Sequence, residues 1–149
     1  ILANLEDGLL LFFTGYTRSA SSMLSDQVVK SEQGSLSMIG NLHAIKQIGV
    51  RSKDALQSGY LRDFANLMNQ QWALKQFRSS GMSNDRIDGF YKLALDNGAL
   101  GGKLVGAGGG GFLLFYTEEK VRLRRAMINA GLREVRFKFD FEGTSTVHA

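Results

Sequence analysis

Four consecutive glycines, Gly108 to Gly111, lie within the segment GGKLVGAGGGGFLLFY at 101–116. Glycine loses more backbone entropy on folding than any other residue, so a run of glycines needs a structural or chemical reason. The usual reasons are positive φ angles or a close approach of backbone to another backbone or to a phosphate. Successive free N–H groups in such a loop can also form an anion-binding concavity. The run is therefore the first candidate for a phosphate-binding element.

Two common nucleotide-binding motifs do not fit this loop. The residues at 106–111 formally match G-x-G-x-x-G, but that motif must open a helix, whereas FLLFY at 112–116 is typical of a strand. A Walker A loop fails as well, because Gly102-Lys103 is followed by leucine and no glycine stands five positions before Gly102. A wide, glycine-tolerant hairpin connection remains the structural alternative.

Arg18 and Lys103 are the basic residues best placed to meet an anion. Arg18 follows a predicted strand and Gly15, where its guanidinium could clamp a sugar phosphate in a bidentate way or simply point into solvent. Thr17 and Ser19 could add hydroxyl donors, although a helix-capping role is favoured. Lys103 could face a phosphate or pair with a carboxylate at the start of its strand.

Lys75 is a further candidate for substrate binding, three positions after Trp72 on the same helical face. Trp72 itself is expected in the core rather than stacked on a sugar. The densest basic cluster, at 120–125, has helical spacing and is expected to be a solvated helix face rather than a phosphate-binding patch.

Composition excludes several kinds of site. The chain has no cysteine and two histidines, which excludes disulfides and thiolate sites and makes a histidine-rich metal site improbable. The net charge is +4, the basic residues are dispersed, and no apolar run is long enough to span a bilayer. We therefore expect a cytoplasmic protein that binds neither nucleic acid nor membrane, with a homodimer left open.

Strands and helices follow from the hydrophobic periodicity. Strands are expected at 8–14, 103–105, 112–116 and 134–141. Helices are expected between residues 19 and 33, then at 36–58, 61–78, 83–97 and 117–130. The order strand, helices, strand, strand, helix, strand predicts an α+β fold: a ferredoxin-like split β-α-β sandwich with a four-stranded antiparallel sheet and extra helices in the first crossover.

The segment KLVGAGGGGFLLF at 103–115 resembles the third signature motif of GHMP kinases, K-x-x-G-A-G-x-G-G followed by an apolar strand. The segment LLLFFTGYTRSA at 9–20 is similar to the strand and turn that open the C-terminal domain in the sugar-kinase branch. NQQWALKQF, SNDRID and EGTSTV also resemble that branch, and the similarity is strongest to kinases of D-glycero-D-manno-heptose 7-phosphate.

The resemblance implies a function and a set of site residues. In that family the glycine loop lies at the cleft between two domains, so the residues expected beside the nucleotide phosphates are Gly106, Ala107, Gly108, Gly109, Gly110 and Lys103. Thr17, Arg18 and Lys75 would then contact the substrate. The resemblance implies ATP and Mg²⁺ as cofactors, a sugar phosphate as substrate, and transfer of the γ-phosphate to the anomeric hydroxyl.

The chain lacks the family's second motif, a P-x-x-x-G-L-G-S-S-like phosphate loop, and contains no proline. Residues 1–149 are therefore expected to be a C-terminal kinase domain without its N-terminal ATP-binding domain. We expect it to hold no catalytic residue and no metal ligand, and to be inactive alone. Beginning at Ile1 rather than methionine agrees with a part of a longer protein. The alternative is a stand-alone ferredoxin-like module that binds a ligand or dimerises without catalysis.

Overall fold

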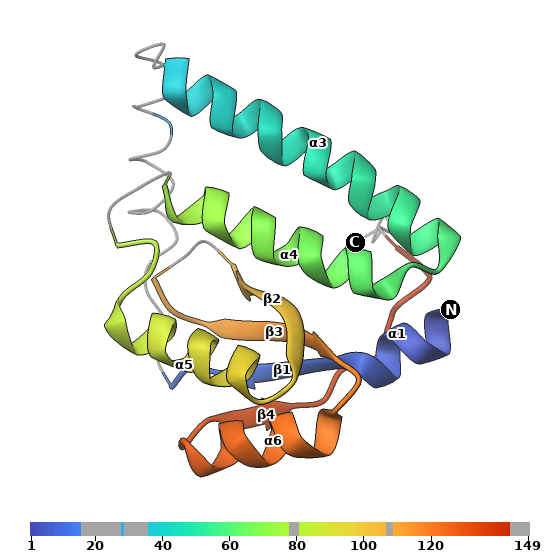
Figure 1. Cartoon of the computed structure of the whole chain (residues 1–149), viewed down its shortest axis with the longest axis vertical. Coiled ribbons are helices and arrows are strands. Elements are labelled where there is room, and N and C mark those ends of the chain that lie inside the picture. Colours follow the sequence, from blue (N-terminus) through green and yellow to red (C-terminus); the bar gives the residue numbers. More distant parts are fainter. Residues whose placement is uncertain (16–27, 29–35, 78–80, 107–108, 144–149) are drawn as a thin grey trace, which may run out of the picture.

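The computed structural model describes residues 1–15, 28, 36–77, 81–106 and 109–143. Its centre is a four-stranded antiparallel sheet with the strand order β2-β3-β1-β4 (Figure 1). The strands are β1 (Leu9–Phe13), β2 (Ala99–Val105), β3 (Phe112–Thr117) and β4 (Arg133–Val135). This order places the first and third strands in the middle, as a ferredoxin-like sheet requires, and it confirms the predicted α+β fold.

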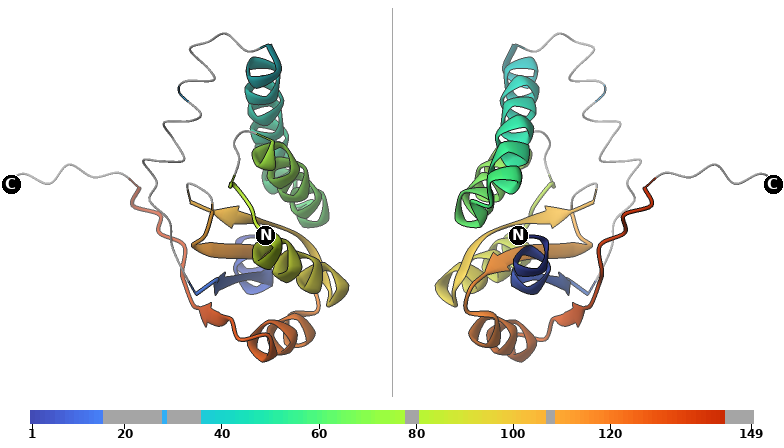
Figure 2. Two further views of the ribbon diagram at one scale, coloured as in Figure 1. Left: turned by 90° about the vertical axis from the view of Figure 1, so that its left-hand side faces the viewer. Right: turned by 90° about the vertical axis from the view of Figure 1, so that its right-hand side faces the viewer.

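Five helices surround the sheet in the described part of the chain. They are α1 (Leu2–Gly8), α3 (Leu36–Ser58), α4 (Leu61–Gln76), α5 (Asp85–Asp96) and α6 (Lys120–Asn129). Helices α5 and α6 cover one face of the sheet, whereas α4 lies along β2 and α3 packs on the outer side of α4 (Figures 1 and 2). The long helices α3 and α4 are thus the extra helices predicted for the first crossover.

The main core lies between the sheet and the layer formed by α5 and α6. Its fully buried side chains alternate along the two central strands and recur at helical spacing on the helices: Phe12, Leu113, Phe115, Ile87, Leu123 and Met127. Trp72 belongs to the same cluster and is 3% exposed, which confirms its predicted core position. A smaller cluster joins α3 to α4 through Ile48, Ala55 and Leu67.

The ends of α5 and α6 carry residues that favour helix termination and capping. The side chain of Asn84 accepts a hydrogen bond of 3.0 Å from the backbone N–H of Ile87, which starts α5. Gly98 and Gly131 follow α5 and α6 with φ angles of +94° and +87°, so both helices end where a glycine permits the left-handed conformation. Asp85 lies in the first turn of α5, where a carboxylate interacts favourably with the helix dipole.

Several predicted boundaries were wrong. Helix α1 was not predicted, and β2 begins at Ala99 rather than at 103 because Gly101 and Gly102 are part of the strand. In the other direction, β4 ends at Val135 instead of 141. The predicted alternation continues beyond β4, since Phe137 and Phe139 are half-buried and the residue between them is exposed. An alternating pattern shows which side chains face the protein, but a β-strand also needs a neighbouring strand to pair with. The helix expected between 19 and 33 falls outside the described residues, apart from position 28.

Within the described ranges, no helix combines the length and the apolar character needed to cross a bilayer.

Candidate functional site

The topology brings two of the nominated segments to one end of the sheet. Phe13 at the end of β1 pairs with Phe112 at the start of β3, so Thr14 lies beside Gly111 at the end of the glycine loop. The hydroxyl of Thr14 donates a hydrogen bond of 2.9 Å to the carbonyl oxygen of Gly111 and accepts one of 3.2 Å from the Gly111 N–H. The two segments, 97 positions apart, are therefore joined through a side chain that is 1% exposed.

The described part of the loop adopts a conformation that favours glycine. Gly106, Gly109 and Gly111 have φ angles of +105°, +71° and +106°, which other residues rarely adopt. The Gly109 N–H donates to the carbonyl oxygen of Met82 at 2.9 Å, so this amide serves to fix the loop in the protein. Gly109 and Gly110 are buried, whereas Gly106 is exposed. The loop is thus the β2–β3 connection and is anchored at its second half.

Three of the nominated residues line one cavity. A cavity of about 250 Å³ between α4 and β2, named here the Lys103 pocket, contains Lys103, Lys75 and Gly106. Its remaining lining residues are Gln71, Trp72, Leu104 and Val105. No acidic side chain lines this pocket, and it opens beside the first residue of the glycine loop.

Lys103 is a half-buried basic residue that lines this cavity. Its Nζ donates a hydrogen bond of 2.8 Å to Oε1 of Gln71, and it forms no ion pair with a carboxylate of the described residues. Burial lowers the pKa of Lys103 below its usual value, because desolvation disfavours the charged form. Of the two roles considered for Lys103, pairing with a carboxylate has no partner among the described residues, and the anion-facing role stays a prediction.

Lys75 comes from the same helix and holds the strand that leads into the loop. Its Nζ donates a hydrogen bond to the carbonyl oxygen of Gly106 and lies 3.5 Å from that of Leu104. Lys75 therefore ties the end of β2 to α4. Gln71, four positions earlier on α4, was missed in the sequence analysis, although the i, i+4 spacing of Gln71 and Lys75 beside a core tryptophan was a usable signal.

Close packing of α4 on β2 positions both lysines. A Cβ atom added to Gly101 would lie 1.9 Å from the carbonyl oxygen of Ala65, so only glycine permits this approach. Asn69 fixes the contact: its Nδ2 donates to the Leu100 carbonyl oxygen at 3.2 Å, and its Oδ1 accepts from the Gly102 N–H at 2.9 Å. Neither Asn69 nor the Gly101–Gly102 pair was nominated from the sequence.

Tyr91 of α5 completes the contacts along the strand. Its hydroxyl lies 2.9 Å from the carbonyl oxygen of Gly102 and also hydrogen-bonds to Asn69. The ring packs at 5.5 Å from Phe115. Burial raises the pKa of Tyr91 to about 12.

Four nominated residues lie outside the part of the chain that the structure describes. These are Thr17, Arg18, Ala107 and Gly108. Their proposed roles therefore stay predictions.

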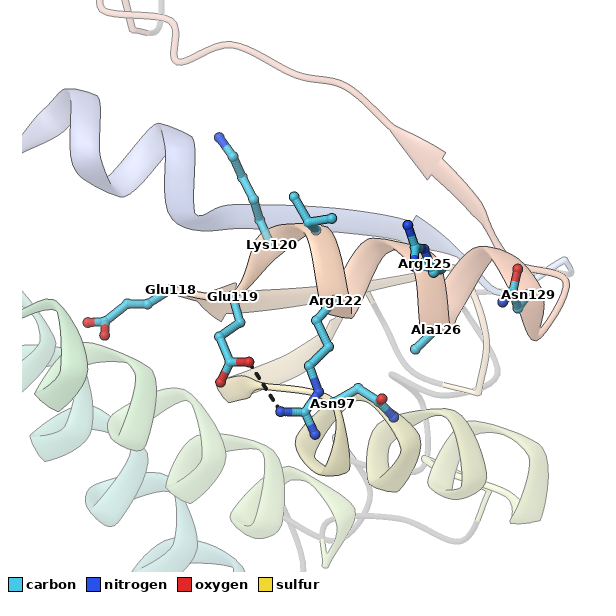
Figure 3. A pocket seen from close by; sticks show the side chains of 9 residues that line it. Asn97, Glu118, Glu119, Lys120, Arg122, Arg125, Ala126 and Asn129 are labelled. Atoms are coloured by element: carbon cyan, nitrogen blue, oxygen red, sulfur yellow. Dashed lines mark hydrogen bonds and ion pairs between the residues drawn. The ribbon is translucent and has the colours of Figure 1, made fainter.

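A second cavity lies at the opposite end of the sheet from the glycine loop. It has a volume of about 750 Å³ and lies over α6 and the end of α5, with Asn97, Arg122 and Arg125 among its lining residues (Figure 3). Arg122 donates to Glu119 at 3.1 Å, as drawn in Figure 3, and also to the carbonyl oxygen of Asp96 at 2.9 Å.

The basic residues of α6 are largely neutralised by neighbouring carboxylates. Besides the Arg122–Glu119 pair, Lys120 pairs with Asp7 and Arg124 pairs with Glu134. These contacts support the expectation that the cluster is a solvated helix face rather than a phosphate-binding patch. They also remove the main reason to place a functional site in the cavity over α6.

The described residues form no metal site: they contain no group of three or more His, Cys, Asp or Glu side chains close enough to hold an ion.

Comparisons with known proteins agree with this geometry. The family model "GHMP kinases C terminal" matches residues 52–133, a range that includes α4, α5, both strands of the β2–β3 hairpin and the glycine loop. The D-glycero-alpha-D-manno-heptose 7-phosphate kinase of Campylobacter jejuni is 34% identical over 144 residues, which cover 97% of this chain and 41% of that protein.

Solved structures show the same fold. A D-glycero-D-manno-heptose 1-phosphate kinase from Bacteroides thetaiotaomicron is 25% identical, with a TM-score of 0.59 over 93% of this chain and 34% of that one. The L. major mevalonate kinase in complex with R-mevalonate is 24% identical, with a TM-score of 0.72 over 81% of this chain and 36% of that one. The chain thus spans less than half the length of these relatives. From the motif at 103–115, the strand order and the family match, this chain belongs to the GHMP kinases as a C-terminal domain.

Proposed function

We propose that residues 1–149 form the C-terminal, substrate-side domain of an ATP-dependent kinase that phosphorylates the anomeric hydroxyl of a heptose 7-phosphate. The family match supports the kinase class, and the 34% identity to a heptose 7-phosphate kinase over nearly the whole chain supports the substrate. The observation that carries the proposal is the contact of Thr14, at the end of β1, with Gly111 of the glycine loop, at the end of the sheet where the Lys103 pocket opens.

The proposed reaction is a phosphoryl transfer. The anomeric oxygen forms a bond to the γ-phosphorus of ATP, the bond from that phosphorus to the β,γ-bridging oxygen breaks, and ADP leaves while the hydroxyl proton passes to a base or to water. The described residues of this chain offer glycine-loop backbone and two lysines, and no group that we assign as the base.

The remaining parts are proposed to come from an N-terminal domain. That domain would supply the phosphate loop and the carboxylates for Mg²⁺, since the described residues here form no such cluster. Thr17 and Arg18 would contact the sugar phosphate, and the backbone at 106–110 would face the phosphates being transferred. We also propose that the kinase is a cytoplasmic protein.

The test is to express the longer reading frame that contains this chain and to assay it with ATP, Mg²⁺ and D-glycero-D-manno-heptose 7-phosphate. The expected product is a 1,7-bisphosphate. Its new ³¹P signal should be a doublet, because an anomeric phosphate couples to one proton, whereas the existing 7-phosphate couples to the two protons of a CH₂ group. ADP release with no new anomeric phosphate would contradict the proposed substrate position.

The isolated chain serves as the second arm of this experiment. We expect no turnover from residues 1–149 alone under the same conditions. A robust Mg²⁺-dependent sugar kinase activity of the isolated chain would refute the division of roles between two domains. A stand-alone binding module is not favoured, because the relatives that match this chain are longer kinases.

A further inference from the structure

We propose that the Lys103 pocket is an oxyanion-binding subsite, in which Lys103 is the principal cation and Gln71 the second donor, and that it takes one phosphate group of a ligand. The assignment of that phosphate to the kinase reaction rests on the proposed function, whereas the binding itself does not.

The pocket offers a ligand more hydrogen-bond donors than acceptors. An ammonium group has three N–H donors, and the described residues use one of those of Lys103, toward Gln71 Oε1 at 2.8 Å. Because that contact occupies the amide oxygen of Gln71, the end of its side chain left for a ligand is the NH₂ group. The carbonyl oxygens of Leu104 and Gly106 are contacted by Lys75. An incoming group with several acceptor oxygens would match the donors that remain.

The side chains that line the pocket also carry a net positive charge. Both titratable side chains in its lining, Lys75 and Lys103, are cationic, and none of the lining residues is acidic. A half-buried ammonium group without an opposite charge carries a desolvation cost that a bound anion would offset. The lowered pKa of Lys103 reports this cost. The basic residues of α6 differ, because three of them already have carboxylate partners.

The size of the pocket limits what it can take. Its volume of about 250 Å³ lies below the range of roughly 300–1,000 Å³ that is usual for pockets enclosing a whole drug-sized ligand. A single phosphate group is therefore a better match than a complete nucleotide. Val105 and Gly106 are the exposed lining residues, so the rest of the ligand would leave the pocket on the side of Gly106.

Titration calorimetry of the 149-residue chain with inorganic phosphate at low ionic strength tests the proposal. We expect saturable binding that Lys103→Met weakens by about tenfold or more, equivalent to about 1.4 kcal/mol. Lys46→Met makes the same change of charge at an exposed position of α3 outside the pocket, and should alter the dissociation constant less than about twofold. Gln71→Leu should weaken binding without any change of net charge.

Two further ligands distinguish the source of the phosphate. Tighter binding of a hexose 6-phosphate than of inorganic phosphate, lost in Lys103→Met, would assign the subsite to the phosphate of the sugar. The same result with ADP would assign it to the nucleotide. No binding of any of the three ligands, or equal binding by wild type, Lys103→Met and Gln71→Leu, would overturn the proposal.

A melting curve establishes that each variant is folded before it is titrated. The kinase assay on the longer protein is a separate measurement, so a failure of the proposed reaction and a failure of this subsite can be told apart.

Discussion

Thr14 and Gly111 form a reciprocal hydrogen-bonded pair that joins the end of β1 to the end of the glycine loop. The Thr14 hydroxyl donates to the Gly111 carbonyl oxygen and accepts from the Gly111 N–H, and the Thr14 N–H donates to the same carbonyl oxygen at 2.9 Å. A buried threonine thus fixes the position of a glycine whose own φ angle is +106°. The position of the end of β1 relative to the end of the glycine loop therefore depends on this pair.

Replacing Thr14 by valine should loosen the loop. Thr14→Val keeps the shape of the side chain but leaves the buried Gly111 N–H without its acceptor, which costs about 1–3 kcal/mol. We expect a lower free energy of unfolding and faster hydrogen exchange at the Gly111 amide, measured by denaturant titration and by NMR. Thr14→Ser keeps the hydroxyl and should retain most of the protection at Gly111. Equal exchange in wild type and Thr14→Val would show that the pair does not hold the loop.

Gly101 should tolerate no side chain, whereas Gly89 should. In Gly101→Ala the new methyl group would overlap the carbonyl oxygen of Ala65, so α4 must move away from β2 at a cost of about 3 kcal/mol or more. Gly89 of α5 has nothing within 4 Å of an added Cβ, and Gly89→Ala should stabilise the helix by about 0.5–1 kcal/mol. The melting temperature should therefore fall for Gly101→Ala and rise for Gly89→Ala. Changes of the same sign in both variants would contradict the close packing of α4 on β2.

Tyr91 should make stability fall at alkaline pH. Its pKa of about 12 in the folded protein exceeds the value of about 10 in an unfolded chain, so folding favours the protonated form. The resulting stabilisation is complete below about pH 10 and is lost as the pH rises toward 12, with a slope of at most about 1.4 kcal/mol per pH unit.

Tyr91→Phe isolates this contribution. The pKa of Tyr116 is also raised by burial, so some alkaline loss should persist in the variant, and the difference between wild type and variant reports Tyr91. Denaturant unfolding at several pH values between 8 and 12 provides the measurement. Parallel pH profiles of the two proteins would mean that Tyr91 does not titrate as its burial indicates.

Lys103→Met should be as stable as wild type or more stable at neutral pH. Because the folded state lowers the pKa of Lys103, protonation opposes folding, and this penalty is present below the folded pKa and disappears as the pH rises through the usual lysine value. We expect a gain of up to about 1 kcal/mol, compared with a change within about 0.5 kcal/mol for Lys46→Met.

Added phosphate should reverse this order. It stabilises a protein that binds it in the folded state, so the melting temperature of wild type should rise while that of Lys103→Met stays nearly constant. A marked destabilisation by Lys103→Met in the absence of phosphate would indicate a structural role for the lysine.

Local chemistry in the sequence predicts the fold well. The apolar run FLLFY predicted the strand β3, and the helix expected at 83–97 agrees with α5, which begins after Asn84 and ends before Gly98. The start of β2 was not predicted, because Gly101 and Gly102 are poor strand formers whose role depends on α4 and Phe115 approaching from elsewhere in the chain. The extent of β4 was overpredicted, because a pattern of exposure does not show whether a partner strand is present.

The candidate site was predicted only in part. The loop at 106–111 could be predicted because a positive φ angle is a requirement of single residues that glycine meets, so the glycines themselves indicate the loop. Thr14, Asn69 and Gln71 have common polar side chains, and nothing local shows that their partners lie 97, 33 and 32 positions away. Such contacts arise only when the sheet order and the path of α4 are known.

The contacts of Asn69 with β2 have a consequence for self-association. One residue of a parallel neighbouring strand would donate its N–H to a carbonyl oxygen and accept, with its own carbonyl oxygen, from the N–H two residues on. The Asn69 side-chain amide makes the same two contacts with Leu100 and Gly102. Tyr91 and Lys75 contact the carbonyl oxygens of Gly102 and Leu104, so side chains already occupy the backbone groups at this edge of β2. A strand from a second molecule would have to displace them, so growth of the sheet by strand addition is directed to the β4 side.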